Sequence, residues 1–148
     1  MDSYNIIKIL SNIFISNNYV IDNEFIKNNS INTVIFINYN GNNNENNNEN
    51  NNRQLESYDK INILIPSNIN FDETNELITN TLLKSNNILI ISNKNLIGFV
   101  IICAFMINNL GITFFQILLL DKIYNVQINK TIYYKLLNLY YNQKKNLL

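Results

Sequence analysis

Histidine is absent from this 148-residue chain, and cysteine and arginine occur only once each, as Cys103 and Arg53. A single thiol excludes an intrachain disulfide, and without histidine the chain has too few ligands for a zinc cluster. A nucleophilic serine would also lack an imidazole to activate it. We therefore expect no metal site, no cofactor and no conventional hydrolytic triad.

Charged residues of both signs are few, and 11 basic side chains balance 11 acidic ones. A chain without excess positive charge has no general attraction for nucleic acid, so we expect no nucleic-acid partner. The opening residues, MDSYNIIKIL, have neither the basic flank nor the unbroken apolar run of a secretory signal. We expect an intracellular protein, located in the cytoplasm.

One long stretch without charge, between Lys94 and Asp121, raises the alternative of a small membrane-associated protein. A helix that spans a bilayer needs about 20 apolar residues. Asn108, Asn109 and Gln116 divide this stretch into halves of about a dozen residues, a length typical of buried core helices. Membrane insertion is therefore not expected, but the alternative is kept.

Apolar runs separated by polar turns predict alternating strands and helices. The expected strands cover residues 5–10, 12–16, 33–37, 61–65 and 88–91. The expected helices cover residues 22–27, 72–84, 96–107 and 112–124, and a last segment after Asn129, with Asp22 and Asn129 as N-caps. This order predicts an α/β fold, a central mixed sheet flanked by helices, with a helical C-terminal half. At this length the chain should form one domain, residues 1–148.

Residues 40–52, NGNNNENNNENNN, form a polar, low-complexity tract between two predicted strands. The tract has no apolar side chain whose burial could offset the entropy lost on ordering. We interpret it as a disordered insertion, which the domain tolerates because longer loops cost little stability.

The stretch that organises the chain is NILIISNKNLIGFVIICAFMI, residues 87–107. It predicts a buried strand, a polar loop and a buried helix. The expected loop consists of Ser92, Asn93, Lys94, Asn95, Leu96, Ile97 and Gly98. Loops that lead from a strand into a helix N-terminus attract anions, because backbone N–H groups and the helix dipole converge there.

This stretch resembles the dual-specificity branch of the cysteine-dependent protein tyrosine phosphatases. Their signature is a Val-Leu-Val-His-Cys strand, then x-x-Gly-x-x-Arg-Ser, then an apolar helix. The resemblance places Ser92 at the nucleophilic cysteine and Gly98 at the arginine that grips phosphate, with Asn95 at the glycine between them. After the strand at residues 61–65, Ser67 occupies the place of the aspartate that serves as general acid.

The resemblance therefore implies a phosphatase fold that has lost its nucleophile, clamp and acid. We expect a catalytically inactive pseudophosphatase that binds a protein partner without gripping phosphate, and self-association stays open. Cys103 is interpreted as a small buried hydrophobe and not as a displaced nucleophile. Asp72 and Glu73 are interpreted as acids that cap their own helix. A weakly active or atypical phosphatase is the second alternative.

Overall fold

The computed structural model describes residues 6–17, 22–39, 58–65, 69–85, 87–92 and 95–146. The strands are β1 (Ile6–Leu10), β2 (Ile13–Ser16), β3 (Thr33–Tyr39), β4 (Asp59–Ile65) and β5 (Ile88–Ser92). The helices are α1 (Asn23–Asn28), α2 (Phe71–Lys84), α3 (Asn95–Leu110), α4 (Phe114–Tyr124) and α5 (Lys130–Asn146). The predicted insertion at residues 40–52 lies outside the described residues.

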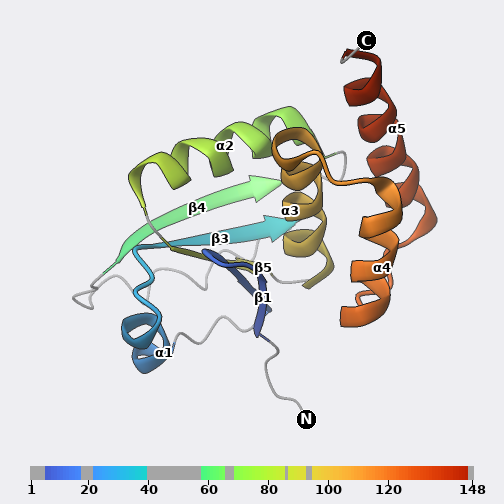
Figure 1. Cartoon of the computed structure of the whole chain (residues 1–148). Helices are drawn as coiled ribbons and strands as arrows, with labels where there is room; N and C mark the ends of the chain where they lie inside the picture. Colours follow the sequence, from blue (N-terminus) through green and yellow to red (C-terminus); the bar gives the residue numbers. More distant parts are fainter. Residues whose placement is uncertain are drawn as a thin grey trace.

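The strands form one mixed sheet in the order β1-β2-β5-β3-β4, with β5 in the centre (Figure 1). β2, β5, β3 and β4 are parallel, and β1 pairs antiparallel with β2. In the register between β5 and β3, Ile88 lies opposite Thr33 and Ser92 lies opposite Ile37. The predicted α/β class with a central mixed sheet is confirmed.

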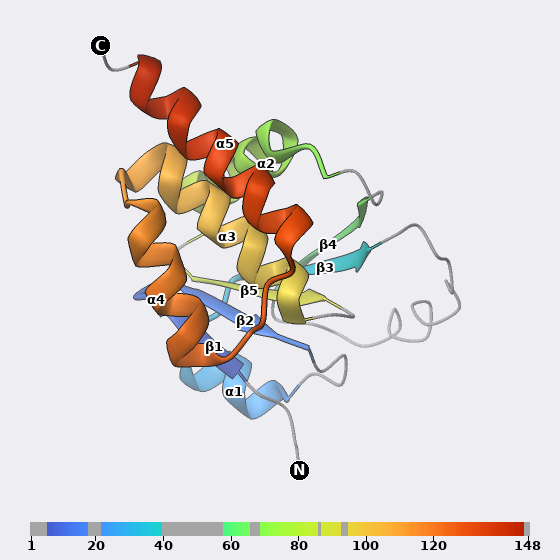
Figure 2. The same ribbon diagram turned by 90° about the vertical axis from the view of Figure 1, so that its right-hand side faces the viewer.

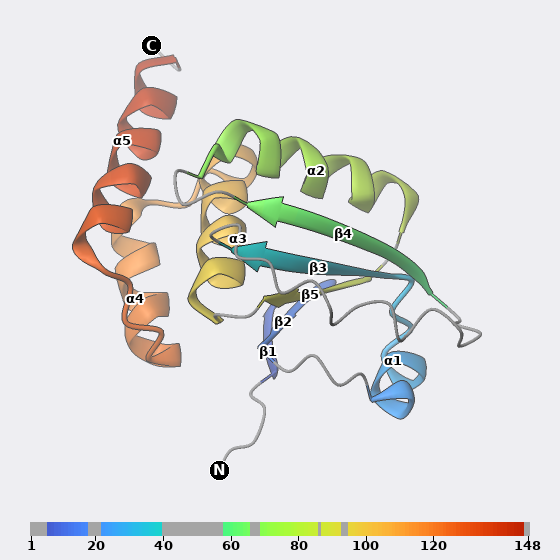
Figure 3. The same ribbon diagram turned by 180° about the vertical axis from the view of Figure 1, so that it is seen from behind.

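Both faces of the sheet are covered, which explains why the central strand is apolar at successive positions. Ile88 and Ile90 belong to the large core cluster on the face of α2 and α3. Leu89 and Ile91 belong to a smaller cluster that includes Ile26 of α1. Figures 1 and 3 show α1 on one side of the sheet and the other four helices on the opposite side. The alternation follows from the two-residue period of a strand.

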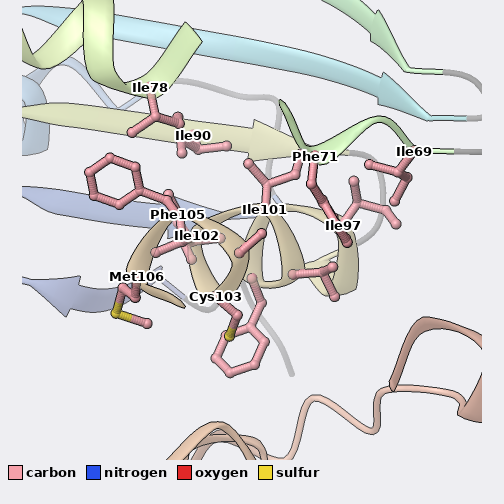
Figure 4. Close-up of a cluster of buried hydrophobic side chains, with 14 of the residues drawn as sticks. Ile69, Phe71, Ile78, Ile90, Ile97, Ile101, Ile102, Cys103, Phe105 and Met106 are labelled. Carbon is pink, nitrogen blue, oxygen red and sulfur yellow. The ribbon is translucent and has the colours of Figure 1, made fainter. Parts of the chain in front are cut away.

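α3 is buried on all sides because it lies between the sheet and an outer layer formed by α4 and α5 (Figure 2). Its residues from Ile97 to Ile107 are all buried. In Figure 4 the side chains of Ile101, Ile102 and Phe105 on α3 lie among Ile78 of α2 and Ile90 of β5. A helix enclosed in this way needs no polar stripe.

Side-chain caps fix where several helices begin. The expected caps Asp22 and Asn129 are confirmed, since their carboxylate and amide oxygens accept backbone N–H bonds of α1 and α5. Asp72 does not cap α2. The cap is Asn70, whose Oδ1 accepts from the backbone nitrogens of Asp72 and Glu73 at 3.0 and 3.3 Å. α4 begins two residues later than expected, because Thr113 is its N-cap in a capping box.

Within the described ranges, no helix is long and apolar enough to cross a membrane. The uncharged stretch that suggested a span is divided into α3 and α4, with Gly111 between them at a φ of +68°. Gly111 adopts a left-handed conformation that residues with a side chain rarely take.

Candidate functional site at the end of the central strand

Ser92 is the last residue of β5 and lies at the carboxyl end of the parallel strands. This is the edge where open α/β sheets place their ligands. By the two-residue period its side chain is on the same face as Ile90, toward α3. The residue is fully buried, with 0% of its surface exposed. Its hydroxyl therefore lies inside the protein, close to the first turn of α3.

Gly98 brings the first turn of α3 against the sheet. A Cβ atom at this position would lie 2.9 Å from Ile15 Cγ2, 3.4 Å from Ser92 Oγ and 3.5 Å from Ile90 Cγ2. The first of these distances is shorter than real Cβ contacts, so a larger residue would force the Ile15 side chain or the helix to shift. Glycine is present because of this close packing, and the space beside Ser92 is filled by protein.

The helix begins earlier than the sequence suggested. The expected loop ran from Ser92 to Gly98, but α3 starts at Asn95, so Asn95, Leu96, Ile97 and Gly98 form its first turn. This corrects the expected boundary. The physical reason is burial: Ile97 is 0% exposed, and the helical turn places its side chain in the core. Asn93 and Lys94 lie outside the described residues, as does Ser67.

Cys103 is buried inside α3 with no exposed surface. Burial, and secondarily the charge of Asp121, raises the pKa of its thiol well above the ordinary value. The thiol therefore stays protonated and packs as a small hydrophobe, as expected. Across the described part of the chain, no three histidine, cysteine, aspartate or glutamate side chains gather closely enough to hold a metal ion.

Asp121, which sequence reasoning passed over, joins α4 to α5. Its carboxylate accepts the backbone N–H groups of Gln127 at 2.7 Å and Ile128 at 3.3 Å, and also the hydroxyl of Tyr133. The sequence could have pointed to Asp121, because it is the sole acidic residue after Glu76. Asp121 is thus a structural anchor that fixes the turn between the two outer helices.

Because of the contact between Tyr133 and Asp121, the free energy of unfolding should vary with pH in the alkaline range. Burial first, and then the hydrogen bond to Asp121, raises the pKa of Tyr133 above its ordinary value of 10. Because the folded-state pKa is higher than that of the unfolded chain, the stabilisation is present below pH 10 and is lost as pH rises toward the raised folded pKa.

We therefore expect the unmodified protein to be more stable than Tyr133→Phe at neutral pH, and this advantage to shrink at about pH 11. Urea unfolding at neutral pH and at about pH 11 measures the difference in free energy of unfolding between the two proteins. Tyr134→Phe is the matched control, since Tyr134 is 62% exposed, and it should keep the unmodified pH profile. A constant advantage of the unmodified protein across this range would contradict the expectation.

A separate hollow of about 250 Å³ lies at the opposite end of the sheet from Ser92. Its lining includes Thr33, Asp59, Lys84 and Ser85, and the hydroxyls of Thr33 and Ser85 share a short hydrogen bond. Thr33 is four residues from Ile37, the partner of Ser92, which is about 13 Å along a strand. This hollow therefore does not serve the Ser92 hydroxyl.

No protein-family model and no curated protein matches the sequence. Two solved structures are similar over nearly the whole chain. A leucine rich repeat and phosphatase domain containing protein from Entamoeba histolytica is 15% identical, with a TM-score of 0.66, and the match covers 95% of this chain and 93% of that chain. DUSP15 is 14% identical, with a TM-score of 0.62 and coverage of 95% for both chains. The chain therefore has the fold of the dual-specificity phosphatases.

Proposed function

We propose that this protein is a catalytically inactive, dual-specificity-phosphatase-like protein that acts by binding another protein. The observation that carries the proposal is the packing of Gly98 against Ile15, with 2.9 Å between Ile15 Cγ2 and a Cβ built on the glycine. The resemblance to the phosphatase signature puts the phosphate-gripping arginine at this position. Glycine has no guanidinium, and even a Cβ at this position would press on the Ile15 side chain, so the group needed for bidentate capture of phosphate is absent.

The other chemical groups support the same conclusion. Ser92 stands where the resemblance puts the nucleophile, but its hydroxyl is buried and the chain has no histidine to take its proton. At the position of the general acid, Ser67 offers a hydroxyl in place of a carboxylic acid. A transfer of phosphoryl to this protein would thus lack an activated nucleophile, a clamp and a proton donor.

Purified protein is expected to hydrolyse neither aryl phosphates nor phosphotyrosine peptides above a heat-inactivated control, because all three groups are replaced. An active dual-specificity phosphatase in the same assay shows that the substrates are competent. Turnover that Ser92→Ala abolishes would contradict the proposal and would support the alternative of a weakly active phosphatase.

The proposed protein binds its partner without recognising phosphate, unlike an inactive phosphatase that holds phosphorylated peptides. We expect affinity capture from the source cell to recover the same protein partner before and after the lysate is treated with a broad phosphatase. The missing clamp is the reason, since charge-assisted arginine contacts provide much of the energy of phosphate capture. Loss of the partner after dephosphorylation would show that a phosphate is still recognised.

A further inference from the structure

The outward side of α4 exposes large apolar side chains. Phe115 is 66% exposed, Ile123 69%, Leu119 46% and Leu118 38%, whereas Ile117 is the fully buried residue of this helix. Figure 2 shows α4 and α5 as the outermost layer, in front of α3. Contiguous apolar surface of this kind on a folded domain marks a site of interaction.

A lysine lies within the same surface. Lys122 is exposed and follows Leu119 and Leu118 by three and four residues, so the three side chains share one side of the helix. We call Phe115, Leu118, Leu119, Lys122 and Ile123 the α4 face. A long lysine side chain can lie along apolar neighbours while its ammonium group reaches a polar surface.

The neutral total charge of the chain hides an uneven distribution. Residues 95–148 contain five lysines and one acidic residue, whereas residues 1–94 contain six basic and ten acidic residues. The one acid, Asp121, is engaged by Tyr133, Gln127 and Ile128 within the fold. α4 and α5 together therefore carry a net positive charge, and Lys122, Lys130 and Lys145 are among their exposed lysines.

The positive charge favours one of two possible partners for the α4 face, a second copy of this chain or a lipid surface. A second copy packed α4 against α4 would offer Lys122 no carboxylate, because none of the residues of the α4 face is acidic. A lipid surface with anionic headgroups satisfies both features, because apolar side chains enter the acyl boundary and lysines contact phosphate. Tyr134 and Tyr141, exposed on α5, are of the type found at the headgroup level.

We propose that the α4 face docks this protein onto membranes rich in anionic lipid. The 11 residues of α4 lie in the plane of the membrane surface, and the lysines of α4 and α5 contact the headgroups. This peripheral attachment is independent of the proposed protein-binding function, and it would place a bound partner at a membrane.

The test uses the full chain and two kinds of vesicle, phosphatidylcholine alone and phosphatidylcholine mixed with phosphatidylserine. In cosedimentation we expect binding to the mixed vesicles that weakens as salt rises, and at least roughly tenfold weaker binding to phosphatidylcholine alone. Phe115→Ser combined with Ile123→Ser should lower binding by about tenfold or more, and Lys122→Gln by about fivefold.

Matched controls come from α2, where Leu83 is 79% exposed and Lys84 is also exposed. Leu83→Ser and Lys84→Gln should bind vesicles as the unmodified protein does, and circular dichroism verifies that every variant is folded. The proposal is overturned by equal binding to both kinds of vesicle, by no binding, or by equal losses in the controls. Self-association without lipid that Phe115→Ser abolishes would assign the α4 face to a second copy and would also overturn it.

Discussion

Gly98→Arg is expected to lower the free energy of unfolding by about 3–5 kcal/mol, enough to unfold much of the protein at room temperature. The Cβ alone meets Ile15 Cγ2 at 2.9 Å, and Ile15 is itself fully buried in β2. The guanidinium would then either remain inside the core as a buried charge or force α3 away from the sheet. Urea unfolding followed by circular dichroism measures the change.

Two variants make the result for Gly98 specific. Leu110→Arg puts the same side chain at a position 54% exposed at the end of α3, and should change stability by no more than about 0.5 kcal/mol. Gly98→Ala should fall between them, because the added methyl group clashes but alanine favours a helix by about 1 kcal/mol. An unchanged urea midpoint for Gly98→Arg would mean that α3 does not approach the sheet so closely.

The same clash would hinder an attempt to build a phosphatase site into this protein. Ser92→Cys would supply a thiol, but the accompanying Gly98→Arg would disrupt the packing that holds the thiol in place. Under the proposed correspondence, introducing phosphatase chemistry requires α3 to move away from the sheet as well as exchanges at Ser92, Gly98 and Ser67.

Phe99→Ala should lower the free energy of unfolding by about 3–5 kcal/mol, on the order of 10 °C in the thermal midpoint. Phe99 is fully buried in α3 and meets the ring of Tyr124 of α4 edge to face, with 6.4 Å between centroids. The truncation leaves a cavity between α3 and the outer layer, whose walls cannot collapse fully. Calorimetry measures the midpoint.

Phe115→Ala is the matched control, since it makes the same change at a residue of α4 that is 66% exposed. Its free energy of unfolding should change by no more than about 0.5 kcal/mol, so its midpoint should stay close to that of the unmodified protein. If both variants lost similar stability, the outward direction of Phe115 would be contradicted.

The sequence predicted the elements well, because the signals are local. The continuous apolar runs at Thr33–Ile37 and Ile88–Ile91 lie within β3 and β5 as observed, since a strand covered on both faces accommodates such runs. Asp22 and Asn129 could be identified as caps because a cap bonds to nitrogens two or three residues away. The fold class followed from the order of such segments.

The structural role of Asn87 could not be predicted from its local sequence. In a chain so rich in this residue, Asn87 did not stand out from the sequence, yet its Nδ2 donates to the carbonyls of Asn29 and Ser30 at 3.0 and 3.2 Å. The contact joins residues 57 and 58 positions apart. Such a role exists only after β5 has been placed beside β3.

The sequence by itself determined that α3 and α4 are apolar helices, and the tertiary structure alone decided that one is enclosed and the other exposed. Their compositions are similar, but α3 lies between the sheet and α5, whereas α4 is at the edge with Phe115 and Ile123 in solvent. The same holds for Gly98: its residue type was visible, but the contact with Ile15 joins positions far apart in the chain. Burial depends on which elements become neighbours, and that choice is made by the packing of the whole domain.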